Sequence, residues 1–260
     1  MIDILSSIHK AATILLPKKH LFLLSHMRSY TSLFGHILGS NPDICGYYEM
    51  HIGYYSWKSL IRQKLLYFSQ ETLKPGFTYM FDKVLHNEHC VSPDILNSGR
   101  TKTIFCLRHP QEVIPSILKL YQGIDPAHEF NSEAFATQYY IRRLAMLEDI
   151  ADSLKQNFFY LDAESLKLDS ENCLRSLSNW LCLETPLSAT YEMQRNTSRQ
   201  RYGDSSARLK AGRITNDRQT YLDFEHDPEL LRRAIDAHTK ARNHLMRSST
   251  HQCVTERVCP

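Results

Sequence analysis

The sequence predicts an α/β fold: a single three-layer domain in which a central, mostly parallel sheet is flanked by helices. Short apolar runs of strand length alternate with longer segments whose apolar residues recur at helical spacing. The chain has 260 residues, 42% of them hydrophobic and 23% charged, which is enough for one large core. No internal repeat, low-complexity tract or long linker divides it. One domain over residues 1–260, with its core at about 20–247, is therefore the simplest organisation.

Five apolar runs are expected to form the strands, joined by right-handed crossovers. They are residues 21–24, 44–48, 77–81, 103–107 and 158–161. Helical spacing indicates helices near 33–38, 57–68, 113–118, 133–156, 170–181 and 228–245, and residues 1–17 are compatible with a lead-in helix. On the second of these helices the side predicted to be buried contains Trp57, Leu60, Ile61, Leu65 and Phe68.

Two segments are not expected to belong to the core. Residues 195–218 contain seven arginines and lysines against two aspartates, and the segment is rich in Ser, Gly and Asn, so it is expected to be a mobile basic loop. Residues 248–260 are expected to be a disordered tail.

Composition limits the classes of function. A net charge of +3 and a pI near 8.4 are too mild to indicate nucleic-acid binding. The seven cysteines form no C-x-x-C pair, and the thirteen histidines form no H-E-x-x-H motif, so we expect free thiols and no metal site. No apolar stretch approaches the ~20 residues of a membrane span. The chain is therefore expected to be cytoplasmic, with no signal peptide.

The loop that follows the first predicted strand is the first candidate site. Residues 25–32 read Ser-His-Met-Arg-Ser-Tyr-Thr-Ser and lead into a predicted helix. The free N–H groups and the positive dipole end of a helix N-terminus favour an anion there. Arg28 adds a charge, and Ser29, Thr31 and Ser32 add hydroxyl groups. An ordinary capped strand–loop–helix is an equally good interpretation of this stretch alone.

A second loop has a similar character. Arg108 follows the fourth predicted strand, and Ser116 comes eight residues later on the next predicted helix. If both strands are central, both loops open on the same edge of the sheet, which suits a ligand with two separated anionic groups. Neither a Walker A motif nor a G-x-G-x-x-G motif is present, which argues against a standard nucleoside triphosphatase or Rossmann site.

The ordered pair R-S-x-T-S and R-x-P-x-x-x-x-x-S resembles the two cofactor-binding motifs of the sulfotransferases, whose co-substrate is 3′-phosphoadenosine 5′-phosphosulfate (PAPS). The resemblance implies the P-loop-like α/β sulfotransferase fold and a bacterial-type member. It also implies that Arg28, Ser29, Tyr30, Thr31 and Ser32 surround the phosphosulfate, and that Arg108 and Ser116 hold the 3′-phosphate. Residues 159–166 and 174–183 are similar to further family segments. The family's cofactor-covering loop is similar in position to the stretch with Arg208, Lys210, Gly212 and Arg213.

Two residues depart from the family pattern. Tyr30 stands where the family usually has glycine, so either the loop needs no positive φ or the tyrosine forms a wall of the site. Pro115, just before Ser116, should delay or kink the start of its helix.

The resemblance also implies catalytic roles. Arg28 would neutralise the sulfonate, and Lys83 would be a second cation near the leaving group. The acceptor hydroxyl needs a base, for which Glu49 is the first candidate and His86 the second, ahead of His51 and His26. For each histidine, a structural role is the more common one.

The expected function is transfer of a sulfuryl group from PAPS to a hydroxyl of a small-molecule, lipid or carbohydrate acceptor, with no metal. One alternative is a nucleotide-dependent phosphotransferase, which should have a magnesium-binding aspartate at a strand end. The other is a non-catalytic nucleotide-binding scaffold. The acceptor and the oligomeric state cannot be read from the sequence.

Overall fold

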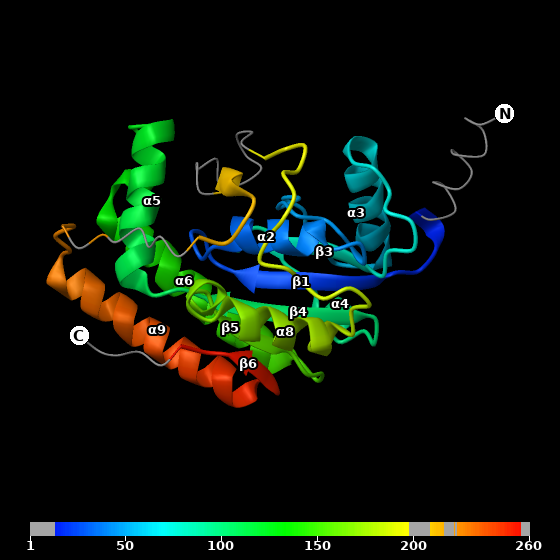
Figure 1. Cartoon of the computed structure of the whole chain (residues 1–260). Coiled ribbons are helices and arrows are strands. Elements are labelled where there is room, and N and C mark those ends of the chain that lie inside the picture. The colour runs from blue at the N-terminus through cyan, green and yellow to red at the C-terminus, as the bar shows by residue number, and fades with distance from the viewer. Residues whose placement is uncertain (1–13, 198–208, 216–220, 222, 256–260) are drawn as a thin grey trace.

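The chain forms one six-stranded sheet in the order β2-β3-β1-β4-β5-β6 (Figure 1). The computed structural model describes residues 14–197, 209–215, 221 and 223–255. All neighbouring strands run parallel, as the sequence predicts. The strands are β1 (Lys19–Ser25), β2 (Ile44–Cys45), β3 (Tyr79–Val84), β4 (Thr101–Leu107), β5 (Phe159–Asp162) and β6 (His251–Cys253).

Helices cover both faces of the sheet, which makes the predicted α/β architecture. They are α2 (Thr31–Ser40), α3 (Trp57–Gln70), α4 (Pro93–Leu96), α5 (Pro110–Ile124), α6 (Glu133–Ser153), α7 (Ser165–Leu168), α8 (Ser170–Leu181) and α9 (Pro228–Ser248), with short 3₁₀ turns η1 (Glu129–Asn131) and η2 (Leu209–Ala211). The predicted lead-in helix falls largely on residues 1–13, which lie outside the described residues.

Strand β1 shows why the sheet is central to the fold. Leu21 and Leu23 pack with α2 and α8, whereas Phe22 and Leu24 pack with α5, α6 and α9. Successive residues of a strand point to opposite faces, so a run of four buried apolar residues is what a strand covered on both sides requires. The carboxyl ends of β1, β3 and β4 therefore lie side by side at one edge of the sheet.

The structure corrects four expectations. The strand predicted at 44–48 covers only Ile44–Cys45, and Glu49 therefore lies in the irregular segment after it. Helix α5 starts at Pro110 and contains Pro115, so Pro115 does not delay its start. The side of α3 that was predicted to be buried was misassigned in part, because Trp57 and Leu65 on that side are exposed.

The fourth correction concerns the tail predicted at 248–260. Residues 251–253 form β6, which pairs with β5 and completes the sheet. The carboxylate of Asp162 accepts a hydrogen bond of 2.9 Å from Thr255 N and pairs with Arg242 of α9. These contacts order the chain to residue 255, and residues 256–260 lie outside the described part.

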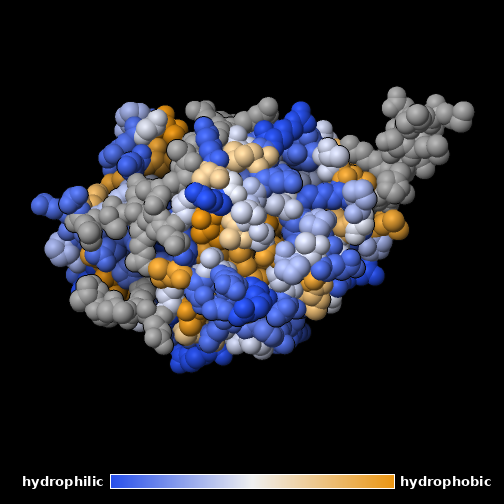
Figure 2. Space-filling view, in the orientation of Figure 1, coloured by the Kyte–Doolittle hydropathy of each residue, from blue (hydrophilic) through white to orange (hydrophobic). Residues whose placement is uncertain are grey.

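The surface in Figure 2 is largely hydrophilic, with hydrophobic residues gathered in a few places. Within the described residues, no helix combines the length and the apolar character needed to cross a bilayer.

Candidate functional site

The loop between β1 and α2 has an unusual backbone. Arg28 has φ 63° and Tyr30 has φ 56°, so two non-glycine residues adopt the left-handed region on either side of Ser29. Tyr30 is also the N-cap of α2. The loop therefore does need a positive φ where the family usually has glycine, and the alternative that it does not is wrong. Turns of this kind, followed by a helix N-terminus, aim backbone N–H groups at an anion.

The hydroxyl of Ser29 is bound inside this loop. It is fully buried, lies 2.5 Å from Ser25 Oγ and donates to the carbonyl oxygen of His26 at 2.7 Å. Ser25 Oγ in turn donates to Cys106 O of β4 at 2.6 Å. Ser29 was predicted to offer its hydroxyl to the cofactor, but here the hydroxyl shapes the loop.

His26 ties the first loop to the second. Its Nδ1 bonds with Met27 O at 2.8 Å, and its Nε2 accepts a hydrogen bond of 3.1 Å from Arg108 N. Burial lowers the pKa of His26 to about 3, so the imidazole is neutral and can accept this bond. His26 therefore has a structural role in the site, in agreement with the more common role of a buried histidine.

Arg28 and Ser116 were predicted to bind opposite ends of the cofactor, yet they are in direct contact. Arg28 Nε donates to Ser116 Oγ at 2.8 Å. Among the described residues, the two terminal nitrogens of Arg28 make no hydrogen bond. The guanidinium therefore presents free donors between the two loops, next to the hydroxyl of Ser116.

Arg108 is held from several sides. It is only 3% exposed, and it donates to Arg28 O and to Tyr30 Oη, each at 2.8 Å. The Tyr30 ring covers its guanidinium, whose carbon lies 4.0 Å from the ring centroid. Its Nε and a terminal nitrogen also pair with the carboxylate of Glu112, one helical turn along α5. Tyr30 is thus a wall of the site, and most of the donors of Arg108 are already engaged.

Lys83 provides a second cation close to the N-terminus of α2. Its side chain leaves β3 on the α2 side of the sheet, and its Nζ lies 3.4 Å from Ser32 Oγ. Lys83 is 2% exposed and Thr31 is 4% exposed. The structure therefore brings Lys83 to Ser32, and the predicted contact of these residues with a cofactor stays a prediction.

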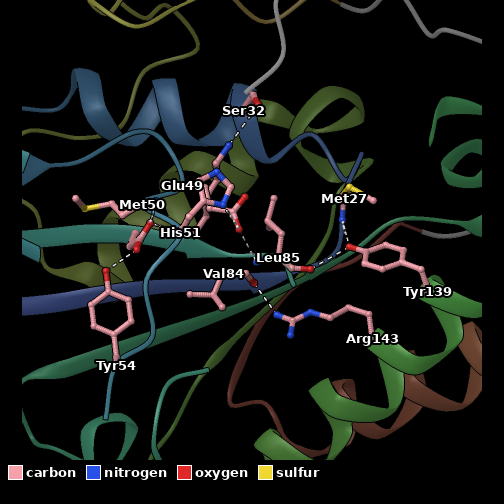
Figure 3. Close-up of polar contacts among 12 residues, drawn as sticks. Met27, Ser32, Glu49, Met50, His51, Tyr54, Val84, Leu85, Tyr139 and Arg143 are labelled. Carbon is pink, nitrogen blue, oxygen red and sulfur yellow. Dashed lines mark hydrogen bonds and ion pairs between the residues drawn. The ribbon is translucent and has the colours of Figure 1, made fainter. Parts of the chain in front are cut away.

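Two of the candidate bases, Glu49 and His51, lie in the segment after β2 (Figure 3), and the third, His86, follows β3. Glu49 is 8% exposed, and its Oε1 accepts from Leu85 N at 3.4 Å and lies 3.8 Å from Nδ1 of His51. His86 is half-buried against the Tyr139 ring, and burial lowers its pKa while Glu49 acts in the opposite direction. Glu49, His51 and His86 thus form one group at the carboxyl end of β3.

Asp82 is a buried carboxyl that sequence reasoning did not single out. It accepts hydrogen bonds from Tyr54 Oη at 2.5 Å and from Met50 N at 3.1 Å (Figure 3). Burial, with the charge of Glu49 adding to it, raises the pKa of Asp82 to about 8. Asp82 therefore fixes the segment that carries Glu49, and its oxygens are already engaged.

Helix α6 supplies three residues that sequence reasoning missed, here called the α6 brace: Tyr139, Tyr140 and Arg143. Tyr139 Oη accepts from Met27 N at 2.8 Å and donates to Leu85 O at 2.9 Å (Figure 3). Tyr140 Oη donates to the carbonyl oxygen of Arg108 at 2.7 Å.

Arg143 completes the brace from a position that is 1% exposed. Its guanidinium donates to Ser25 O at 2.8 Å, to Val84 O at 2.6 Å and to Asn87 Oδ1 at 3.0 Å. The α6 brace therefore holds the ends of β1, β3 and β4 in place. Only the helical period of this segment, and not these contacts, is visible in the sequence.

The predicted cofactor-covering loop is only partly described. Arg208 lies outside the described residues. Lys210 lies in η2, Gly212 has φ 65° and accepts from Tyr191 N at 2.8 Å, and Arg213 forms an antiparallel bridge with Thr190. The side chains of Lys210 and Arg213 are exposed. Their predicted contact with a cofactor stays a prediction.

As a whole, the site consists of a helix N-terminus flanked by Arg28 and Lys83, with Glu49 in the irregular segment that follows β2. Such an arrangement can bind a doubly charged anion and, beside it, accept a proton. Among the described residues, no group of three or more His, Cys, Asp or Glu side chains is placed to hold a metal ion.

Comparisons with known proteins agree with this architecture. No protein-family model matches the chain, and no curated protein matches it. Among solved structures, the chain is similar to one titled "Sulfotransferase Domain from the Curacin Biosynthetic Pathway". The TM-score is 0.56 and the identity 17%, over 85% of this chain and 97% of that one. The chain therefore has a sulfotransferase fold.

Proposed function

We propose that this protein is a sulfotransferase that moves the sulfuryl group of PAPS to a hydroxyl of a small-molecule, lipid or carbohydrate acceptor. The observation that carries the proposal is that Arg28, in the loop before α2, contacts Ser116, while Lys83 contacts Ser32 in the first turn of α2. These residues come from both segments of the motif pair and from β3, which lies between the two segments in the sequence. The sulfotransferase fold supports the same conclusion.

The residues fit the phosphosulfate end of PAPS well. The α2 N-terminus, Arg28 and Lys83 supply positive charge around one point, and Ser32 and Thr31 add hydroxyls. At the 3′-phosphate end of PAPS, the two residues expected to hold the phosphate, Arg108 and Ser116, differ in how well they fit that role. The Ser116 hydroxyl accepts from Arg28 Nε and can still donate to a phosphate, whereas Arg108 acts mainly by fixing Tyr30 and the backbone of Arg28.

In the proposed mechanism, the donor supplies the sulfuryl group and leaves as adenosine 3′,5′-bisphosphate. Arg28 and Lys83 stabilise the negative charge that gathers on the transferred group and the leaving oxygen. Glu49 takes the proton of the acceptor hydroxyl as the new oxygen–sulfur bond forms and the old one breaks. The contacts with Leu85 N and His51 orient the Glu49 carboxylate for this task.

Binding of adenosine 3′,5′-bisphosphate, measured by calorimetry, tests the site without knowledge of the acceptor. Arg28→Ala should weaken it by roughly 10-fold or more, because charged hydrogen bonds are lost. Arg100→Ala is the matched control, since this exposed arginine precedes β4 at the other end of the sheet. Equal affinities of the native chain and Arg28→Ala would contradict the proposal.

Two further measurements separate the alternatives. A phosphotransferase should bind ATP with magnesium more tightly than the bisphosphate, which a thermal-shift comparison detects. Asp82 is a poor magnesium ligand in this fold, because Met50 N and Tyr54 Oη already donate to its two carboxylate oxygens. A non-catalytic scaffold should bind the bisphosphate but transfer no radiolabelled sulfate from PAPS to any member of an acceptor panel.

A further inference from the structure

Helix α3 departs in part from the usual amphipathic arrangement, because it buries two polar side chains beside Tyr67 and Phe68 and exposes two leucines. Gln63 and Lys64 are 0% and 3% exposed, whereas Leu65 and Leu66 are 52% and 36% exposed. Gln63 Oε1 lies 3.0 Å from His20 Nδ1 and Lys64 Nζ donates to Leu16 O at 2.8 Å, whereas the buried Gln63 Nε2 has no hydrogen-bond partner among the described residues. Such a helix exposes apolar side chains to solvent, although it contains polar side chains that could have taken the exposed positions.

The apolar surface continues beyond the two leucines. Of the ten large hydrophobic side chains that are exposed among the described residues, six lie on α3, just before it or on the segment that Lys64 holds against it. We call them the α3 apolar face: Leu15, Leu16, Tyr55, Trp57, Leu65 and Leu66. Figure 2 shows hydrophobic surface at the right-hand end of the molecule, where α3 lies in Figure 1. Apolar surface that is gathered in this way marks an interaction site.

The charges around the face indicate the kind of partner. Residues 55–70 include no Asp or Glu, and the exposed Lys58 and Arg62 stand between the aromatic and the leucine ends of the face. Lys58 Nζ lies 5.9 Å from the centroid of the Trp57 ring. Basic side chains next to exposed Trp, Tyr and Leu are typical of surfaces that enter the interface of an anionic bilayer.

We propose that the α3 apolar face docks reversibly on a bilayer that contains anionic lipid. Leu65, Leu66 and Trp57 insert among the lipid chains and headgroups, and Lys58 and Arg62 pair with the anionic headgroups. The docking is independent of the sulfuryl-transfer chemistry, so its test needs neither donor nor acceptor.

The test is co-sedimentation of the full chain with vesicles of phosphatidylcholine alone or of phosphatidylcholine with phosphatidylserine. The chain should bind the anionic vesicles at least roughly 10-fold more tightly than the neutral ones, and high salt should remove most of the difference. The double variant Leu65→Ser/Leu66→Ser should lose binding to the anionic vesicles by roughly 10-fold or more. Leu168→Ser is the matched control, because Leu168 is 53% exposed on α7.

A second variant separates the charge from the apolar contacts. Lys58→Glu/Arg62→Glu should bind anionic vesicles as weakly as neutral ones. Trp57 also reports insertion directly, because its fluorescence should shift to shorter wavelength on anionic vesicles.

Three results would overturn the proposal. The first is equal binding to both kinds of vesicle or to neither. The second is an equal loss of binding in Leu168→Ser. The third is a dimer in solution that Leu65→Ser/Leu66→Ser dissociates, since a second copy of the chain would then cover the face.

Discussion

Acid should destabilise this protein through His26, the buried imidazole that joins the two loops of the site. The neutral ring bonds with Met27 O through Nδ1 and accepts from Arg108 N through Nε2. A second proton on the ring would abolish the acceptor and place a charge beside Arg143 and Arg108, which already act to lower its pKa. Protonation of His26 therefore opposes both the fold and the shape of the site.

The magnitude follows from the pKa of His26. Burial lowers this pKa from 6.5 to about 3. The unfolded chain takes up the proton below pH 6.5 and the folded chain does not, so stability falls as the pH drops through this window and is unaffected above it. The loss is roughly 1.4 kcal/mol for each pH unit and reaches about 5 kcal/mol near pH 3. A typical domain is stabilised by only about 5–15 kcal/mol.

Other buried groups titrate in the same range, so the test compares two chains. Burial raises the pKa of Asp82 to about 8, and this group favours the folded state as the pH falls from 8 towards 4. It therefore opposes His26 in the native protein. His26→Gln keeps an acceptor for Arg108 N but cannot be protonated.

The assay is the free energy of unfolding by urea between about pH 7.5 and 5, for the native chain and for His26→Gln. Below pH 6.5 the slope of the free energy of unfolding against pH should be less positive in the variant by about 1.4 kcal/mol for each pH unit, whatever its stability at neutral pH. Parallel curves would refute the reasoning, because they would show that His26 binds the same number of protons in both states.

Four other substitutions test separate parts of the site. Tyr30→Gly should be about 1 kcal/mol more stable to urea than Tyr30→Ala, since only glycine adopts φ 56° without a penalty; equal stabilities would contradict this. Arg143→Met should lower the free energy of unfolding by about 3 kcal/mol, because two buried strand-end carbonyls lose their donor. Glu49→Gln should reduce sulfuryl transfer roughly 100-fold, and near-normal turnover would exclude it as the base. Arg108→Ala should weaken binding of adenosine 3′,5′-bisphosphate about 10-fold by releasing Tyr30, and calorimetry would show an unchanged affinity if this is wrong.

The central part of the fold could be predicted because its signals are local. The apolar runs of β1 and β4 are buried on both sides, and a polar loop follows each of them. Strand β6 could not be predicted, because His251–Cys253 is short and contains two polar residues. It is a strand because its backbone pairs with the edge of β5. The buried side of α3 was misassigned because the exposed Trp57 and Leu65 recur at the helical spacing that is typical of buried apolar residues.

The sequence predicts which residues belong to the candidate site, but it does not predict the contacts between them. The motif pair places Arg28 and Ser116 at opposite ends of the cofactor, whereas in the structure they form a direct hydrogen bond that spans 88 residues of sequence. The pairing of Arg108 with Glu112 has helical spacing and could have been found from the sequence. The bonds of Tyr139 and Arg143 join residues that are 112 and 118 positions apart, and no local pattern reveals them.

These distant bonds have a consequence for biosynthesis. The loop that surrounds Ser29 leaves the ribosome before the α6 brace that fixes it, which is made more than a hundred residues later. Contacts of such long separation form late, because the intervening chain must be ordered first. A nascent chain that ends before Glu133 therefore contains the whole binding motif and lacks the bonds that give it its shape. Competence to bind an anion should appear abruptly during synthesis, once α6 has docked.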